Sequence, residues 1–452
     1  MASYNERRAA PRSPRTPCQR QTPMPKDLRK IITSPTINTP NPFVGFGGFC
    51  GWPRICRLSN GDLYTTFSAG YWHASWVNPR PDLPTEYAEY MDNALPGGST
   101  WHAPSGGHIM WTRSSDDGAT WTPPRDLAVI PHAYAAGAIA QHSDGTLYAA
   151  ALIQRSHFHA ERIPQAPLAF LRTLHEHFPE EIAVLRSEDN GESWREVGRT
   201  SGPFLSRLEN PCSITEAKDG SLLLLIDGHA VPGAEKTRWV NALLHSSDRG
   251  ATWQTRSIFG HDDYDMEEGH LVYLPDGRIG TCSRPWGLWI TSDDEGFTWS
   301  EPRAILGLKP LAGRPDPNGC KKGGLLVTSD GTVVLLTCGR PGGNGQVLYS
   351  RDSGETWIKP APDRGFTTDR YAYYPGACLM PDDSIFMVGD HQGFANPYGP
   401  FGAEVIATRF RILAENEGEG IEIMRIDGAL HEPWGEEQDG GEAADRKIEK
   451  DA

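Results

Sequence analysis

SSDDGATW, at residues 114–121, is the first copy of a short pattern that recurs along the chain and indicates its fold. It predicts a tight turn, because the aspartate can accept hydrogen bonds from the turn's own backbone and the glycine can adopt a positive φ. The tryptophan is then expected to pack back under the turn. The pattern S-x-D-x-G-x-[ST]-W occurs five times, which chance does not explain. The four further copies are SEDNGESW (187–194), SSDRGATW (246–253), SDDEGFTW (292–299) and SRDSGETW (350–357).

A second element, a hairpin signal flanked by apolar and β-branched residues, alternates with these turns. Six such signals with almost no helical periodicity predict an all-β fold, a six-bladed β-propeller built from four-stranded antiparallel blades. The sixth signal has no turn cassette after it, so we expect the last blade to be closed by a strand from the N-terminus. The signals are SNGDLY (59–64), SDGTLY (143–148), KDGSLL (218–223), PDGRIG (275–280), SDGTVV (329–334) and PDDSIF (381–386).

Composition limits the other features of the chain. The 452 residues carry 43 basic and 58 acidic side chains, and this net charge of −15 argues against nucleic acid as a partner. No apolar run reaches the ~20 residues of a membrane-spanning helix, and no signal peptide is evident, so we expect a cytoplasmic protein without a membrane partner. The eight cysteines form no CxxC pair, so we expect no metal and no cofactor.

The domain organisation follows from where the repeats lie. Residues 1–41 are rich in Arg and Pro, and we expect them to form a disordered N-terminal extension. Residues 42–430 hold all the repeats and should form the propeller. Residues 431–452 are expected to be an acidic disordered tail.

Candidate site residues emerge when the blades are aligned on their hairpins. The position eight residues before the hairpin Asp or Asn should lie at the rim of each innermost strand. Glu268 in blade four and Tyr374 in blade six share this position, and a carboxylate beside a phenol can form an activated nucleophile. Arg54, Arg284 and Arg340 reach the same rim from three blades, and such a set suits a carboxylate ligand.

The repeated turns, called Asp boxes, and the six hairpins together resemble the sialidase (neuraminidase) superfamily over about residues 42–425. The resemblance implies an exo-glycosidase that acts on an acidic, sialic acid-like sugar with retention of configuration. It also implies that Tyr374 is the nucleophile and Glu268 its activating base. Glu268 precedes LVYLPDG as the family's glutamate precedes V-V-x-L-x-D-G, and Tyr374 precedes CLMPDDSI as the family's tyrosine precedes the last hairpin.

The family binds the substrate carboxylate with three arginines. WPRICRL is similar to the family's F/Y-R-I-P segment, with Arg54 as the first arginine and a cysteine in place of the proline. Arg284 follows the fourth hairpin at the family's spacing. Arg340 is assigned as the third arginine, with Arg314 in reserve, because Arg351 lies inside an Asp box and should face away from the axis.

The family's general acid/base is an aspartate on a loop of blade one, about a dozen residues before the first Asp box. Here that position holds His102, and histidine can also transfer protons near neutral pH. A carboxylate from the insertion at residues 70–107 could take the role instead by folding over the mouth. The candidates on this insertion are Asp82, Glu86, Glu89 and Asp92.

Three functions remain open at this point, and each has an acidic sugar or glycan as the partner. The first is the sialidase-like exo-glycosidase. The second is a lyase or hydrolase of uronic-acid polysaccharides, which would keep the arginines and use His102 and Tyr374 for proton transfer. The third is a non-catalytic carbohydrate-binding propeller, whose signature would be loss of the Tyr374 and Glu268 pair.

Overall fold

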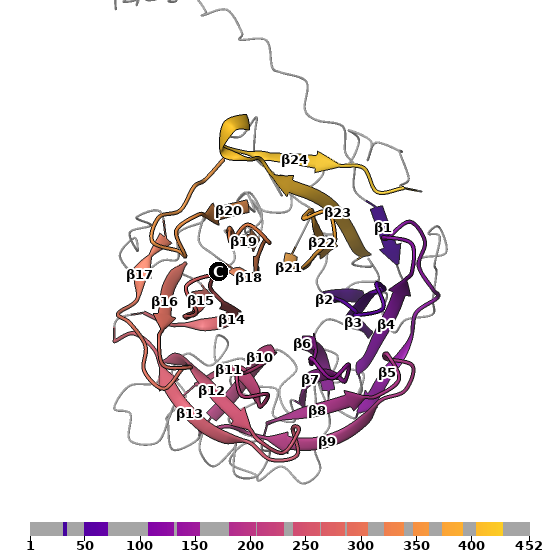
Figure 1. The fold of residues 1–452 in the computed structure, drawn as a ribbon. Coiled ribbons are helices and arrows are strands. Elements are labelled where there is room, and N and C mark those ends of the chain that lie inside the picture. The colour runs from indigo at the N-terminus through magenta and orange to yellow at the C-terminus, as the bar shows by residue number, and fades with distance from the viewer. Residues whose placement is uncertain are drawn as a thin grey trace, which may run out of the picture.

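The computed structural model of the chain describes residues 30–33, 49–70, 107–130, 133–153, 180–204, 206–229, 238–262, 264–284, 287–305, 321–338, 347–360, 373–391 and 404–427. Over these ranges the chain consists of β-strands and turns, with one short 3-10 helix at Glu415–Glu417. The strands form six antiparallel sheets arranged in a ring around a central axis (Figure 1). The predicted six-bladed propeller is therefore confirmed. No helix in these ranges is long and apolar enough to cross a membrane.

Each blade runs outward from a first strand at the axis, and the strand order follows the chain (Figure 1). Blade one consists of β2 (Phe49–Arg57), β3 (Leu63–Gly70), β4 (Gly107–Ser114) and β5 (Arg125–Ile130). Blade two consists of β6 (Ala133–Gln141), β7 (Leu147–Ile153), β8 (Glu181–Ser187) and β9 (Arg195–Thr200). Blade three consists of β10 (Ser206–Glu216), β11 (Leu222–His229), β12 (Trp239–Ser246) and β13 (Gln254–Phe259). Blade four consists of β14 (Glu267–Tyr273), β15 (Ile279–Arg284), β16 (Leu288–Ser292) and β17 (Arg303–Ala304). Blade five consists of β18 (Lys321–Val327), β19 (Val333–Cys338) and β20 (Val347–Ser350). Blade six contains β21 (Tyr373–Leu379), β22 (Ile385–His391) and β23 (Glu404–Ile412).

The hairpin signals join the first strand of each blade to the second. In five blades the hairpin glycine adopts a φ between 81° and 97°, and in blade six Asp383 takes this position with a φ of 64°. Buried apolar side chains of neighbouring blades pack between the sheets, as where Tyr64 and Trp111 of blade one share a cluster with Leu185 of blade two. The core is therefore a ring of inter-blade layers, which fixes each first strand against its neighbours.

The five Asp boxes join the third strand of a blade to its outer edge, away from the axis. In the second box Ser187 Oγ donates to Asp189 Oδ1 over 2.7 Å and accepts from Gly191 N over 2.9 Å. Asp189 Oδ1 also accepts from Ser193 N, and the serine–aspartate pattern recurs in the other four boxes. Asn190 and Gly191 both have positive φ. The boxes are thus structural turns, closed by serine and aspartate together.

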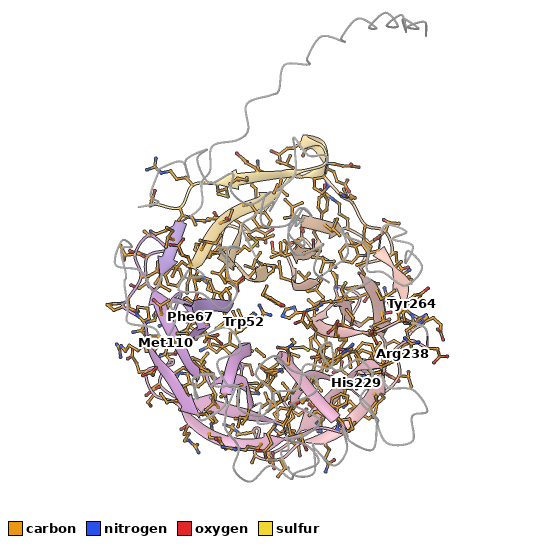
Figure 2. The ribbon with its side chains drawn as sticks, turned by 180° about the vertical axis from the view of Figure 1, so that it is seen from behind. Trp52, Phe67, Met110, His229, Arg238 and Tyr264 are labelled. Carbon is orange, nitrogen blue, oxygen red and sulfur yellow. The ribbon has the colours of Figure 1, made fainter. Side chains whose placement is uncertain are left out.

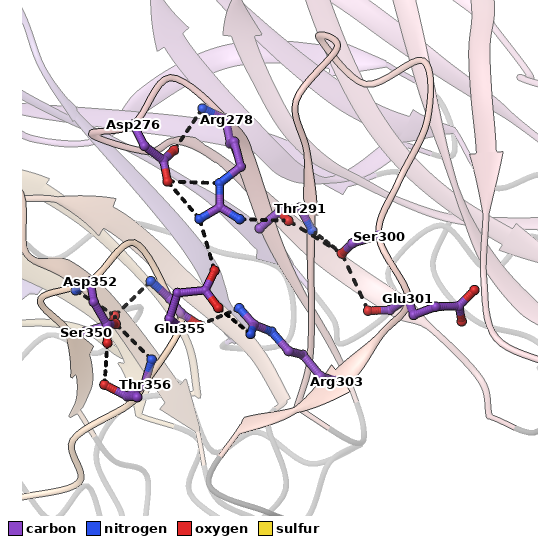
Figure 3. Close-up of polar contacts among 11 residues, drawn as sticks. Asp276, Arg278, Thr291, Ser300, Glu301, Arg303, Ser350, Asp352, Glu355 and Thr356 are labelled. Carbon is purple, nitrogen blue, oxygen red and sulfur yellow. Dashed lines mark hydrogen bonds and ion pairs between the residues drawn. The ribbon is translucent and has the colours of Figure 1, made fainter.

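Charged side chains on the outer surface link one blade to the Asp box of the next. Glu355 in the fifth box accepts from Arg278 Nη2 over 3.1 Å and from Arg303 Nη1 over 2.6 Å, both in blade four (Figure 3). Glu192 in the second box accepts in the same way from Arg113 and Arg125 of blade one. Such exposed pairs contribute little individually, on the order of 0–1 kcal/mol each.

Two short strands share the outer edge of blade six (Figure 1). β1 (Lys30–Thr33) pairs with residues 405–407 of β23, and β24 (Ile421–Met424) pairs with residues 409–412 of the same strand. Lys30 Nζ donates to the Asp427 carbonyl over 3.1 Å and to the Ala119 carbonyl in the first Asp box. The expectation that an N-terminal strand closes the last blade is confirmed.

This closure corrects the expected boundary of the disordered N-terminal extension. Lys30–Thr33 belongs to blade six, because the β-branched run KIIT buries Ile32 completely in the cluster between blades one and six. A strand of only four residues within an Arg- and Pro-rich segment cannot be recognised from the sequence. The other parts of the extension, and the acidic tail at residues 431–452, lie outside the described residues.

Candidate active site

Each first strand carries a β-bulge at or beside the predicted rim position. A bulge inserts an extra residue into one strand and redirects the side chain at that point. At three bulges the residue adopts a left-handed backbone conformation, with φ of 53° at Trp52, 51° at Glu268 and 50° at Tyr374. This conformation is uncommon and strained for bulky side chains, and such residues concentrate at functional sites. Blades one, four and six therefore present the same unusual backbone near the axis.

Glu268 is a buried carboxylate, 4% exposed, held from two sides. Its Oε2 accepts a hydrogen bond from Arg284 Nη1 over 2.7 Å, and its Oε1 accepts from Asn210 Nδ2 over 3.3 Å. Arg284 Nε lies 3.5 Å from Glu267 Oε1, so one guanidinium serves two carboxylates. The structure thus brings together two predicted site residues, Glu268 and Arg284.

The electrostatics of Arg284 connect this pair to Tyr374. Burial alone would lower the pKa of the Arg284 guanidinium, but Glu267, Glu268 and the Tyr374 phenol outweigh it and raise that pKa well above its ordinary value. Arg284 is therefore permanently charged. A cation in contact with a carboxylate also favours the ionised form of that carboxylate, here Glu268.

Tyr374 is half-buried and packs against the apolar cluster formed by blades one to three. Its ring meets the indole of Trp52 edge to face, with ring centroids 6.5 Å apart and an interplanar angle of 73°. Its main-chain carbonyl accepts a hydrogen bond from Arg54 Nη1 over 2.9 Å. Blade one therefore contacts both the ring and the backbone of Tyr374.

Arg54 donates hydrogen bonds to three backbone carbonyls, and its expected contact with a ligand carboxylate stays a prediction. Its Nε donates to the Gly137 carbonyl over 3.0 Å, and its Nη1 donates to the carbonyls of Pro53 and Tyr374, each over 2.9 Å. Arg54 lies two residues after Trp52, which shares the register of Glu268 and Tyr374. These donors of Arg54 brace three blades against one another.

Two buried aspartates support the rim from equivalent places on second strands. Asp227 and Asp390 are each 0% exposed, and each follows its hairpin aspartate by eight residues, as Arg284 does. Asp390 Oδ2 accepts from Trp52 N over 2.9 Å, and Asp227 Oδ1 accepts from Cys212 Sγ over 3.1 Å. The shared register of Asp227, Asp390 and Trp52 can be read from the sequence, whereas their contacts and the contact of Asn210 with Glu268 cannot.

Other predicted residues cannot be placed in the site. His102, Arg340, Arg314 and the carboxylates of the insertion lie outside the described residues. Arg351 donates to the Leu413 carbonyl at the outer side of blades five and six, as its Asp box position implied. Among the described residues no group of three or more His, Cys, Asp or Glu side chains is arranged to hold a metal ion.

Comparisons with known proteins agree with this architecture. Residues 180–364 match the BNR repeat-like domain family. A sialidase of Paraclostridium sordellii is 26% identical over 204 residues, and the match covers 37% of this chain and only half, 50%, of that protein.

Two solved structures share the fold of nearly the whole chain. A protein of unknown function from Dyadobacter fermentans is 16% identical with a TM-score of 0.57, over 88% of this chain and 99% of that one. The intramolecular trans-sialidase from Ruminococcus gnavus, in complex with oseltamivir carboxylate, is 13% identical with a TM-score of 0.54, over 85% and 97%. At these identities the likeness shows the fold.

Proposed function

We propose that this chain, a BNR-repeat β-propeller of the sialidase-like superfamily, is an exo-glycosidase that removes an acidic, sialic acid-like sugar from glycans. The observation that carries the proposal is the partly buried ion pair of Glu268 and Arg284, whose guanidinium interacts electrostatically with the Tyr374 phenol. A base, a cation and a phenol near the axis are the groups that a tyrosine nucleophile requires.

The proposed reaction begins with proton transfer from the Tyr374 hydroxyl to Glu268 as the phenol oxygen attacks the anomeric carbon. The bond to the leaving oxygen breaks, and His102, or a carboxylate of the 70–107 insertion, protonates that oxygen. Water then attacks the anomeric carbon of the glycosyl–tyrosine intermediate and gives its proton to the group that protonated the leaving oxygen, now acting as a base. The bond to Tyr374 breaks, Glu268 returns its proton to the phenolate, and the two displacements give net retention. A neutral phenol suits this step because the carboxylate next to the anomeric carbon repels an anionic nucleophile.

Arg284 links substrate binding to the basicity of Glu268. The Arg284 side chain is 20% exposed, so we propose that its guanidinium also binds the substrate carboxylate, together with Arg340. A second anion on the same guanidinium raises the proton affinity of Glu268. Glu268 would thus become a stronger base when an acidic sugar binds. Arg54 braces the Tyr374 backbone, and its role as the first arginine for the substrate carboxylate stays a prediction.

The proposal is tested by comparing aryl glycosides of an acidic and of a neutral sugar with the full chain. We expect the full chain to turn over the acidic glycoside. In Tyr374→Phe the turnover rate should fall by at least ~10³-fold, because the covalent route is removed. Tyr273→Phe is the matched control, because the Tyr273 phenol also bonds a carboxylate, Glu295, but lies at the hairpin end of β14, opposite the end that carries Glu268. Full activity in Tyr374→Phe would refute the nucleophile. An unsaturated product with conjugated ultraviolet absorbance would indicate the lyase instead.

A further inference from the structure

Trp52 occupies, on blade one, the same bulge position that Glu268 and Tyr374 occupy on blades four and six. Its φ of 53° is strained for so large a side chain. A tryptophan that only filled space at the axis would not require this backbone conformation. Blade six fixes the conformation, because Asp390 Oδ2 accepts the Trp52 N–H over 2.9 Å from a fully buried position. Figure 2 shows Trp52 close to the axis of the ring.

The strained backbone aims the indole at Tyr374. The two rings meet edge to face, an arrangement that aromatic quadrupoles favour. The indole is also buried, and it belongs to the apolar cluster of blades one to three against which Tyr374 packs. Two residues later Arg54 holds the Tyr374 carbonyl. One bulge of blade one thus constrains both the main chain and the ring of Tyr374.

We infer that Trp52 is a positioning residue for the reaction: it holds the Tyr374 ring with its hydroxyl directed toward Glu268 and Arg284. The inference rests on the proposed function of Tyr374 as a nucleophile. A tyrosine hydroxyl lies at the end of two rotatable bonds, so a half-buried ring without a lateral contact would sample unproductive orientations. Restricting the nucleophile to a near-attack orientation lowers the barrier to its attack.

The kinetic test compares Trp52→Leu and Trp52→Phe with Trp121→Leu. Trp121 is the matched control, because it is also 7% exposed but lies in the first Asp box at the outer surface. On an acidic aryl glycoside we expect kcat to fall roughly 10–100-fold in Trp52→Leu, with KM within about twofold, and most of the rate to be kept in Trp52→Phe. Trp121→Leu should lose thermal stability and keep kcat. Equal kcat in Trp52→Leu and Trp121→Leu would overturn the inference.

A second measurement needs no substrate and so separates this inference from the proposed function. 3-Fluorotyrosine is incorporated at position 374 and observed by fluorine NMR in the full chain. Trp52→Leu should shift and broaden its resonance, because the ring current and the lateral contact of the indole are both lost, whereas Trp121→Leu should leave it unchanged. An unchanged resonance in Trp52→Leu overturns the positioning role even if the wild-type chain hydrolyses acidic glycosides. A shifted resonance in a chain that turns nothing over refutes only the function.

Discussion

At the scale of single residues, the position of Glu268 depends on the glycine that follows it. A Cβ atom on Gly269 would lie 2.9 Å from Leu225 Cδ2, 3.0 Å from Thr281 Oγ1 and 3.1 Å from Asn241 Oδ1, all closer than ordinary contacts. Gly269→Ala should therefore displace the strand that carries Glu268 and destabilise the fold by about 1–3 kcal/mol. We expect a drop in kcat of about tenfold or more, because small misplacements of a catalytic group are costly.

The control for Gly269→Ala is Gly220→Ala in the third hairpin. Its φ of 81° makes an alanine strained there, but nothing lies within 4 Å of the added Cβ. It should lower the thermal midpoint without changing kcat. If both variants keep full activity, Gly269 does not position Glu268.

The proton donor gives a second prediction at this scale. If His102 protonates the leaving oxygen, His102→Ala should cost roughly 10²–10⁴-fold in rate on a glycan with a poor leaving group. The cost should be much smaller on an aryl glycoside, whose leaving group needs no proton, whereas Tyr374→Phe should impair both. Steady-state rates on the two substrates decide the matter. Equal and small losses on both substrates would show that His102 is not the proton donor.

At the scale of elements, the Asp boxes should make the fold sensitive to acid. Hydrogen bonds from the Ser193 hydroxyl, the Ser193 amide and the Ser187 hydroxyl lower the pKa of Asp189 from 3.8 to about 2. The ionised carboxylate therefore stabilises the fold above about pH 4, and this contribution is lost as the pH falls toward 2.

The matching variant is Asp189→Asn, which removes the charge at every pH. Its thermal midpoint should lie below that of the wild type at pH 5–7, and the gap should narrow as the pH approaches 2. Ser193→Ala, which removes one of the hydrogen bonds, should show a smaller gap with the same trend. A gap that widens on acidification would contradict the assignment.

The short strand β1 gives the other prediction for an element. Ile32 is fully buried between blades one and six, whereas Ile31 of the same strand is only half-buried. Ile32→Ala should cost about 2–5 kcal/mol of unfolding free energy. Ile31→Ala should cost clearly less, because its side chain leaves a smaller cavity. Denaturant titration measures both, and equal losses would mean that β1 does not close the ring as described.

The elements also show which features the sequence could predict. Hairpins and Asp boxes are local, so five serines and aspartates with the same bonds are visible as a repeated pattern. The partners of Glu268 are not local, since Asn210 lies 58 residues away in another blade. The bulge in β2 directs Arg54 to backbone carbonyls, and a bulge depends on strand pairing that the sequence does not display.

At the scale of the whole molecule, the ring brings distant segments to one level near the axis. Trp52, Glu268 and Tyr374 belong to blades one, four and six, and each reaches the axis through a bulge in a first strand. Blade six contributes to the site twice, through Tyr374 and through the carboxylate of Asp390 on Trp52 N. Because β1 closes that blade, the geometry of the site depends on an intact ring.

The central claim is that Tyr374 forms a covalent bond with an acidic sugar, and trapping tests it most directly. The full chain is incubated with a sialic acid-type glycosyl fluoride that carries a second fluorine beside the anomeric carbon, which slows hydrolysis of the glycosyl intermediate. Peptide mapping by mass spectrometry then locates the adduct. We expect one sugar per chain, attached to Tyr374, and no adduct in Tyr374→Phe. An adduct on any other side chain, or turnover of the acidic glycoside with inversion and no adduct, would rule out Tyr374 as the nucleophile.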